Sequence, residues 1–143
     1  MKVWAYIHPE LNILCCALLP EAVPQGVQAI GFEVETPDDV ILDNGQIRVK
    51  TEVEKLQEEK QRKLAGLKSY VASLLAPTDY VITKIAEAQV VGDTEQVNVL
   101  KQKYSAQLQR REAIRQWNEQ IKQAINNAQS LEELRSIVIE FKG

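Results

Sequence analysis

The chain has 143 residues, of which 45% are hydrophobic and 26% charged, and its formal net charge is −3. A chain of this size and composition can bury enough surface to fold without disulfides or metals, which excludes wholesale disorder. Residues 1–50 carry three basic and seven acidic residues, and residues 51–143 carry 14 basic and 13 acidic residues. Neither part has the basic excess that is typical of a nucleic-acid-binding protein.

Residues 1–50 predict a small β-module. Residues 3–7 are rich in β-branched and aromatic side chains, and two further apolar runs follow, each bounded by Pro or Gly. Asn44 and Gly45 then separate two short apolar segments, which indicates a hairpin because a primed turn needs positive φ at both central residues. We therefore expect an antiparallel meander of four or five short strands.

Residues 51–76 predict a charged connector helix. Thr51 and Glu54 have the spacing of a capping box, and Pro77 ends the helix because it disfavours the α conformation at the residue before it. Six apolar residues fall on one stripe of this helix: Val53, Leu56, Leu64, Leu67, Val71 and Leu74. Lys60 interrupts the stripe, so a coiled coil formed through it would be weak by itself.

Residues 77–143 predict a helical hairpin or small bundle. A short helix ends at Gly92, and a stripe of apolar residues then continues for about thirty residues, with Arg111 as a charged interruption. A capping box at 130–133 opens a last helix, which we expect to reach Phe141. The sequence thus predicts an α+β protein: a small N-terminal antiparallel β-meander, then a helical hairpin or bundle that could associate as a coiled coil.

The residues needed for catalysis or metal binding are scarce. His8 is the only histidine and lies in a predicted turn. Cys15 and Cys16 are adjacent, so in a strand they point to opposite faces, and they are too few for a zinc site. They are best interpreted as small apolar residues of a reducing compartment, with a reactive outward-facing thiol as the alternative. No Gly-rich phosphate loop or known catalytic motif is present, so we expect no enzymatic activity, cofactor or metal.

Two segments have alternative surface interpretations. Trp4 and Tyr6 share one face of the first predicted strand, where core packing is the default and an aromatic docking surface for a partner protein is the alternative. Residues 101–122 carry six basic and two acidic side chains, a pattern that could contact phosphates. Trp117 lies on the apolar stripe of that segment, which favours a solvated basic face over a nucleic-acid surface.

Residues 74–81, Leu-Leu-Ala-Pro-Thr-Asp-Tyr-Val, resemble a pattern in small tail-associated proteins of tailed phages and prophages, including tail-fibre assembly proteins and fibre-end domains. That pattern has a helix ending in Leu-Leu, a Thr/Ser-Asp-aromatic cap, a helical arm with Arg and Trp, and a short closing helix. The arm is similar to residues 110–117 and the closing helix to residues 130–134, Ser-Leu-Glu-Glu-Leu. The resemblance covers residues 64–140. It departs from the family at residues 82–91, where extra helix-forming residues replace a short acidic loop.

The resemblance implies a non-enzymatic tail protein, either a virion component or a chaperone of tail-fibre or baseplate assembly. Its implied partners are other phage tail proteins, and its implied location is the host bacterial cytoplasm during assembly or the virion tail. The longest apolar run, residues 13–19, is far shorter than the roughly 20 residues of a membrane span, and the opening residues lack the apolar core of a signal peptide. We therefore expect no membrane partner.

We expect a homo-oligomer in which a defined set of side chains contacts partners. Those side chains are Trp4, Tyr6, Val53, Leu56, Leu64, Leu67, Val71 and Leu74. The alternative from another functional class is a small regulatory or adaptor module whose basic helix contacts nucleic acid, which the charge balance disfavours.

Overall fold

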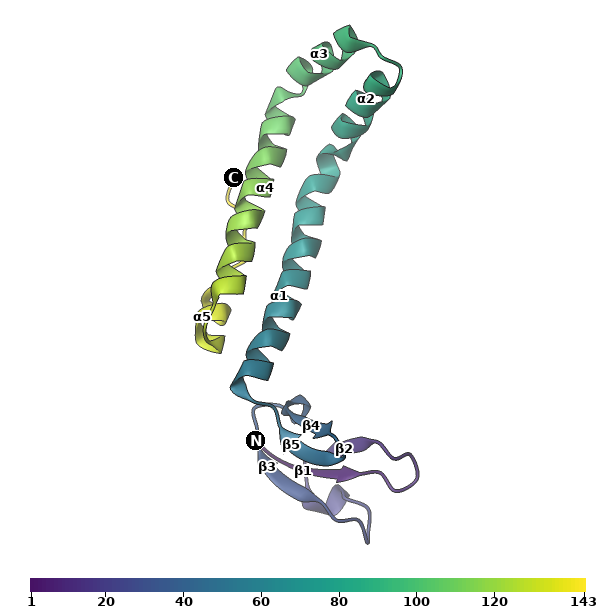
Figure 1. Cartoon of the computed structure of the whole chain (residues 1–143), viewed down its shortest axis with the longest axis vertical. Helices are drawn as coiled ribbons and strands as arrows, with labels where there is room; N and C mark the ends of the chain where they lie inside the picture. Colours follow the sequence, from purple (N-terminus) through teal and green to yellow (C-terminus); the bar gives the residue numbers. More distant parts are fainter. The chain divides into compact units, whose positions relative to one another are not determined.

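The computed structural model describes all 143 residues, which form two compact units, Met1–Lys55 and Leu56–Gly143. The strands all lie in the first unit and long helices make up the second (Figure 1). The predicted α+β class is therefore confirmed, with antiparallel strands first and a helical hairpin after them.

The first unit contains five short strands in two antiparallel sheets. The three-stranded sheet has the order β2-β1-β3, and β4 pairs with β5 in a separate hairpin. Asn44 and Gly45 connect β4 to β5 with φ of 50° and 80°, as the predicted primed turn requires. The strands are β1 (Lys2–Ile7), β2 (Leu14–Ala17), β3 (Ile30–Glu33), β4 (Val40–Asp43) and β5 (Gln46–Val49), with short 3₁₀ turns at Pro20–Ala22 and Pro37–Asp39.

The core of the first unit lies on one face of β1. Val3 and Ala5 are fully buried there, together with Val34 and Val40. The side chain of Trp4 projects from the opposite face, because successive residues of a strand alternate. The partly buried side chains packed against this core are Leu14, Cys16, Phe32, Ile47 and Val49.

Helix α1 (Glu52–Leu75) begins at the predicted capping box. The Glu54 N–H donates to Thr51 Oγ1 at 3.2 Å, and the Thr51 N–H donates to Glu54 Oε1 at 3.3 Å. Arg48 adds three side-chain bonds, two to Glu54 at 2.8 and 3.3 Å and one to Asp43 at 3.0 Å. The hydrogen bond from Arg48 lowers the pKa of the Glu54 carboxyl, so the helix starts with a charged cap.

The second unit is a hairpin of helices. Helices α1 and α2 (Asp79–Val90) run outward, and α3 (Thr94–Lys103) and α4 (Ser105–Asn127) return beside them (Figure 1). Pro77 ends α1 at Leu75, close to the predicted position, but the chain continues into α2 through a single 3₁₀ turn, Ala76–Thr78. The outward arm is thus interrupted but not redirected.

The last helix is shorter than the sequence predicts. Helix α5 (Leu131–Ser136) starts at the expected capping box, since Ser130 accepts a bond from the Glu133 N–H at 3.1 Å. It ends at Ser136, so the expectation that it reaches Phe141 is wrong. Residues 137–139 are all β-branched (Ile, Val, Ile), which favours extended backbone, and Ile137 already has φ −75° and ψ 114°.

Two apolar cores hold the hairpin together. One lies between α2 and α3 and contains Val81, Ile85, Ala88, Val97, Leu100 and Tyr104, with Leu108 packed against it. The other joins α1 to α4 and α5 through Leu67, Ile125, Ala128 and Leu134. The partly buried residues around this second core are Leu56, Leu64, Val71, Trp117, Ile121, Ile137 and Ile139.

Two lysines of α1 donate hydrogen bonds to carbonyls near the C-terminal ends of α4 and α5. Lys60 Nζ donates to the Asn126 carbonyl at 3.0 Å, at the end of α4, and Lys63 Nζ donates to the Leu134 carbonyl at 2.7 Å, in α5. Cations are favoured at helix C-termini, where carbonyls lack intrahelical partners. Lys60 interrupts the apolar stripe because it caps a helix of the same chain.

Arg111 joins the two arms where Pro77 interrupts the first. The Asp79 N–H bonds to the Ala76 carbonyl and not to the Leu75 carbonyl, which accepts the Thr78 hydroxyl at 3.0 Å. Arg111, only 6% exposed, supplies Nη1 at 2.9 Å to the Leu75 carbonyl, and the same nitrogen lies 2.9 Å from both Thr78 Oγ1 and Asp79 Oδ1.

We predict that Arg111→Met destabilises the helical unit by about 2 kcal/mol, because the aliphatic part of the side chain is kept while the Leu75 carbonyl, Thr78 and Asp79 lose the charged donor that they share. Chemical denaturation followed by circular dichroism measures the change. Arg115→Met, at an exposed position one turn later in α4, is the control and should shift stability by less than about 0.5 kcal/mol. Equal midpoints for the two variants would contradict the role given to Arg111.

Candidate protein-interaction site

The predicted partner-binding stripe of α1 is largely covered by the chain's own helices. Leu67 is 1% exposed, and Leu56, Leu64 and Val71 pack around the same core, with α4 and α5. Leu74 is half-buried, and Val53, in the first unit, is 68% exposed. The structure therefore packs four of these six side chains into the hairpin core and leaves Leu74 half-buried, and Val53 alone is well exposed.

The two aromatic candidates of β1 differ in exposure. Tyr6 is 9% exposed, whereas Trp4 is half-buried. Trp4 pairs with Ala17 on one side and Gly31 on the other, and Lys2 Nζ lies 5.6 Å from its ring centroid. A β-carbon at Gly31 would lie 3.2 Å from Lys2 Cε, so the glycine leaves room for the Lys2 side chain that lies over the Trp4 ring. Trp4 is thus the more accessible of the pair.

The cysteines and the histidine lie in structural settings. Cys15 and Cys16 are free thiols, and burial, with Cys15 and Asp38 nearby, raises the pKa of Cys16 and so opposes thiolate formation. His8 Nδ1 accepts bonds from the N–H groups of Glu10 and Leu11, which close a turn. No three His, Cys, Asp or Glu side chains are grouped so that they could hold a metal.

The basic segment 101–122 is divided between core and surface. Arg111 is buried, and Arg110 Nη1 donates to the Gly143 carbonyl at 2.8 Å. Trp117 packs edge-on against Tyr70 and Phe141, with ring centroids 5.8 and 5.6 Å away. It belongs to the core of the hairpin, as its place on the apolar stripe predicts, and does not present a free face for stacking on a base.

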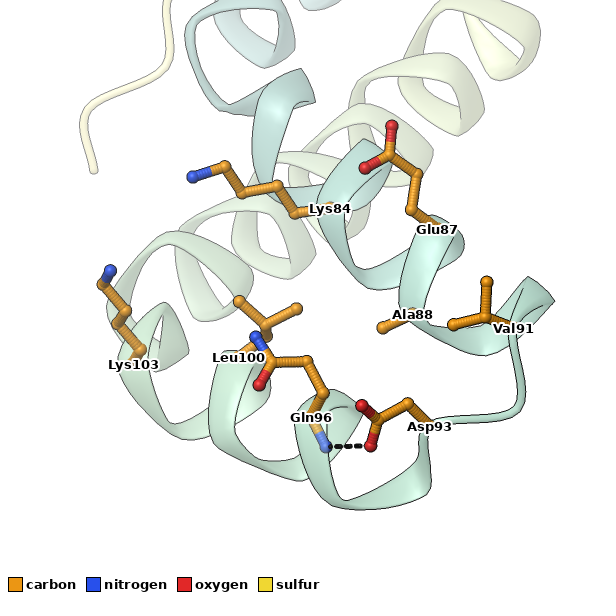
Figure 2. Close-up of a pocket in the computed structure, with 8 residues that line it drawn as sticks. All are labelled: Lys84, Glu87, Ala88, Val91, Asp93, Gln96, Leu100 and Lys103. Carbon is orange, nitrogen blue, oxygen red and sulfur yellow. Dashed lines mark hydrogen bonds between the residues drawn. The ribbon is translucent and has the colours of Figure 1, made fainter.

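The tip of the hairpin is the most exposed apolar part of the second unit. Gly92 has φ +74°, the left-handed conformation that ends α2, and Asp93 Oδ1 accepts the Gln96 N–H at 3.0 Å to start α3 (Figure 2). Immediately before this turn, Val90 and Val91 are 87% and 78% exposed. Burying a valine contributes about 1.5 kcal/mol or more, so two such side chains in water favour contact with another surface.

A pocket of about 440 Å³ opens between α2 and α3 beside this turn (Figure 2). Ala88, Val91 and Leu100 supply its apolar surface. Its charged side chains are balanced, since the two lysines are matched by two carboxylates, and this balance gives the pocket no preference for a small anion. The polar lining residues are Lys84, Glu87, Asp93, Gln96 and Lys103.

An aromatic and lysine cluster supports the pocket from one side. Tyr80 and Tyr104 pack edge to face with centroids 5.6 Å apart, and Lys84 Nζ lies within 5.9 Å of both ring centroids. Lys103 Nζ lies 5.2 Å from the Tyr104 ring. The hydrogen bond from Lys84, at 3.4 Å, lowers the pKa of the Tyr104 hydroxyl. These contacts fix the lysine stems against the tip.

A second depression, of about 460 Å³, lies on the outer face of α2 and is more apolar. Ile82, Ala86 and Val90 follow one another at intervals of four residues along it, and Val91 and Glu87 belong to both depressions. None of these residues is among the partner-binding residues that the sequence predicts. The signal that could have indicated this surface is a second apolar stripe on α2, because only one stripe of that helix can face α3.

Comparisons with protein families, with curated proteins and with solved structures found no match for this chain. None of its helices combines the length and the hydrophobicity that are needed to span a bilayer.

We predict that Gly92→Ala and Gly66→Ala change stability in opposite directions. At Gly92 a β-carbon costs about 1 kcal/mol, because the left-handed conformation is strained for other residues. Gly66 lies within α1, where an added β-carbon meets no atom within 4 Å, so alanine should stabilise the helix by about 0.5–1 kcal/mol. Denaturant midpoints of the two variants and the parent measure both effects, and destabilisation of equal size at both positions would contradict the turn geometry.

Proposed function

We propose that this protein is a non-enzymatic component of a phage or prophage tail that acts through protein–protein contacts at the tip of its helical hairpin. It is either a virion component or a chaperone of tail-fibre or baseplate assembly. Its partners are other tail proteins, met in the host bacterial cytoplasm during assembly or in the virion tail.

The observation that carries this proposal is the exposure of Val90 and Val91 at the tip. The inner face of α2 already contributes Val81 and Ile85 to the core, so the outer apolar residues are not needed to close the hairpin. Apolar surface that is rimmed by polar residues and has no role in folding is typical of interaction sites. The outer depression, with Val90 and Val91, lies in residues 82–91, where the chain departs from the tail-protein pattern, so the tip is supported by its exposure and not by the resemblance.

The two units supply different means of association. The α1 stripe, from which we expected partner contacts and a homo-oligomer, is covered largely by α4 and α5. Association through the hairpin is therefore better supported at the tip than along the stripe. Trp4 and Val53, which are accessible in the first unit, stay candidates for additional partner contacts.

We predict that Val90→Ser/Val91→Ser impairs tail assembly while leaving the chain folded, because both side chains lie in water before any partner binds. The gene would be deleted from the phage or prophage that carries it, and the variant supplied from a plasmid. Infectious particles should fall at least about tenfold relative to the parent gene, as expected when roughly 1.4 kcal/mol or more of contact energy is lost. Particles are counted by plaque titre and electron microscopy.

Val138→Ser is the matched control, since Val138 is also a valine, 69% exposed and outside the tip. Full complementation by the tip variant, or equal loss with the control, would contradict the proposal. Mass spectrometry of purified particles separates the two forms of the function, because a virion component remains in them and a chaperone does not.

A further inference from the structure

The C-terminal segment covers one side of the α1–α4 pair. Residues 137–143 leave α5 and run beside α4 (Figure 1). The Phe141 N–H donates to the Tyr70 hydroxyl at 3.1 Å, and the Phe141 ring packs on Trp117. Arg110 lies over the same ring, with its Cζ 5.5 Å from the centroid. This side of the hairpin is therefore closed by the chain itself.

The other side of the pair has an open groove of about 440 Å³. Leu64, Leu67 and Val71 of α1 line it, and Asn118 and Lys122 of α4 form the opposite wall. Leu64 and Val71 are partly buried and pack against the hairpin core. They lie seven residues apart, which is two helical turns or about 10 Å along α1. The groove thus presents an apolar strip two turns long.

Basic side chains flank this groove. Lys68 lines it from α1 and Lys122 lines it from α4, and both side chains are exposed. Glu119 lies 3.2 Å from Lys122, with both side chains about half exposed. Such surface ion pairs are weak, so two lysines against one carboxylate leave the rim positive.

We propose that this groove binds an amphipathic helix of a partner protein, one that carries carboxylates beside its apolar face. An apolar strip with anchor positions one and two turns apart is the arrangement that takes a helix into a groove. The lysines on the two walls would meet carboxylates on both sides of that helix. The groove lies on the α1–α4 arms, apart from the residues of the tip, so the two surfaces can act independently.

Two synthetic peptides of about four helical turns test the proposal on the full chain. Both carry leucines one and two turns apart on an alanine background, and they differ only in having glutamate or lysine at the flanking positions. Fluorescence anisotropy measures their affinities. The glutamate peptide should bind at least about tenfold more tightly than the lysine peptide, and high salt should narrow the difference.

The variant Lys68→Glu/Lys122→Glu should reverse this preference, because it makes the rim of the groove acidic. Both lysines are exposed, and the apolar residues of the groove are unchanged. The matched control, Lys101→Glu/Lys142→Glu, changes net charge equally at exposed positions outside the groove and should keep the preference of the parent chain. The tip variant Val90→Ser/Val91→Ser should bind the glutamate peptide as the parent does, which separates this groove from the site of the proposed function.

Three results would each overturn the proposal. One is that neither peptide binds, or that both bind equally. Another is that the control pair reverses the preference as completely as the groove pair does, since that would assign the effect to overall charge. The third is that light scattering shows a dimer of the parent chain that dissociates only in the groove variant, since a second copy would then be the occupant.

Discussion

The helical unit depends on one guanidinium group. Pro77 interrupts the outward arm, and in the 3₁₀ turn that accommodates it the Asp79 N–H bonds to the Ala76 carbonyl and not to the Leu75 carbonyl. Arg111 donates to the Leu75 carbonyl from the opposite arm, beside the Thr78 hydroxyl, and pairs with Asp79. The interruption in the first arm thereby fixes how the two arms align lengthwise, because Arg111 of α4 must lie beside it to donate these bonds.

Charged side chains also join the two arms at the end of the hairpin where α1 packs against α4 and α5. Lys60 and Lys63 donate to carbonyls near the ends of α4 and α5, and Arg135 Nη2 lies 2.8 Å from Glu59 Oε1. Charged residues that would weaken a seam between two separate chains are matched to groups within this one. The amphipathic stripe of α1 is therefore mainly an internal contact of the hairpin, and its partly buried edge at Leu64 and Val71 is the part that lines the groove.

Much of the local structure could be predicted from the sequence, because it depends on short-range signals: Asn44-Gly45 at a hairpin turn, Thr51 with Glu54 at a helix start, and Gly92 at a helix end. Contacts between residues far apart in the sequence could not be predicted. Arg111 and Lys60 look like interruptions until their partners, 36 and 66 residues away, are known. The end of α5 could not be predicted, because a capping signal marks where a helix starts and gives no length. The tip surface could not be predicted either, because two apolar stripes on α2 do not reveal which one faces α3.

The two cores of the hairpin differ in the length of chain that they close. The core between α2 and α3 lies within residues 81–108, whereas the contacts of α1 with α4 and α5 join residues as many as 76 positions apart. Because closing a long loop costs more entropy than closing a short one, the turn at Gly92 is the expected nucleus of folding, from which the arms then pair toward α5. Comparison of folding rates for tip and arm variants would reveal that order. The end of the hairpin that presents the apolar surface is then also the part that forms first.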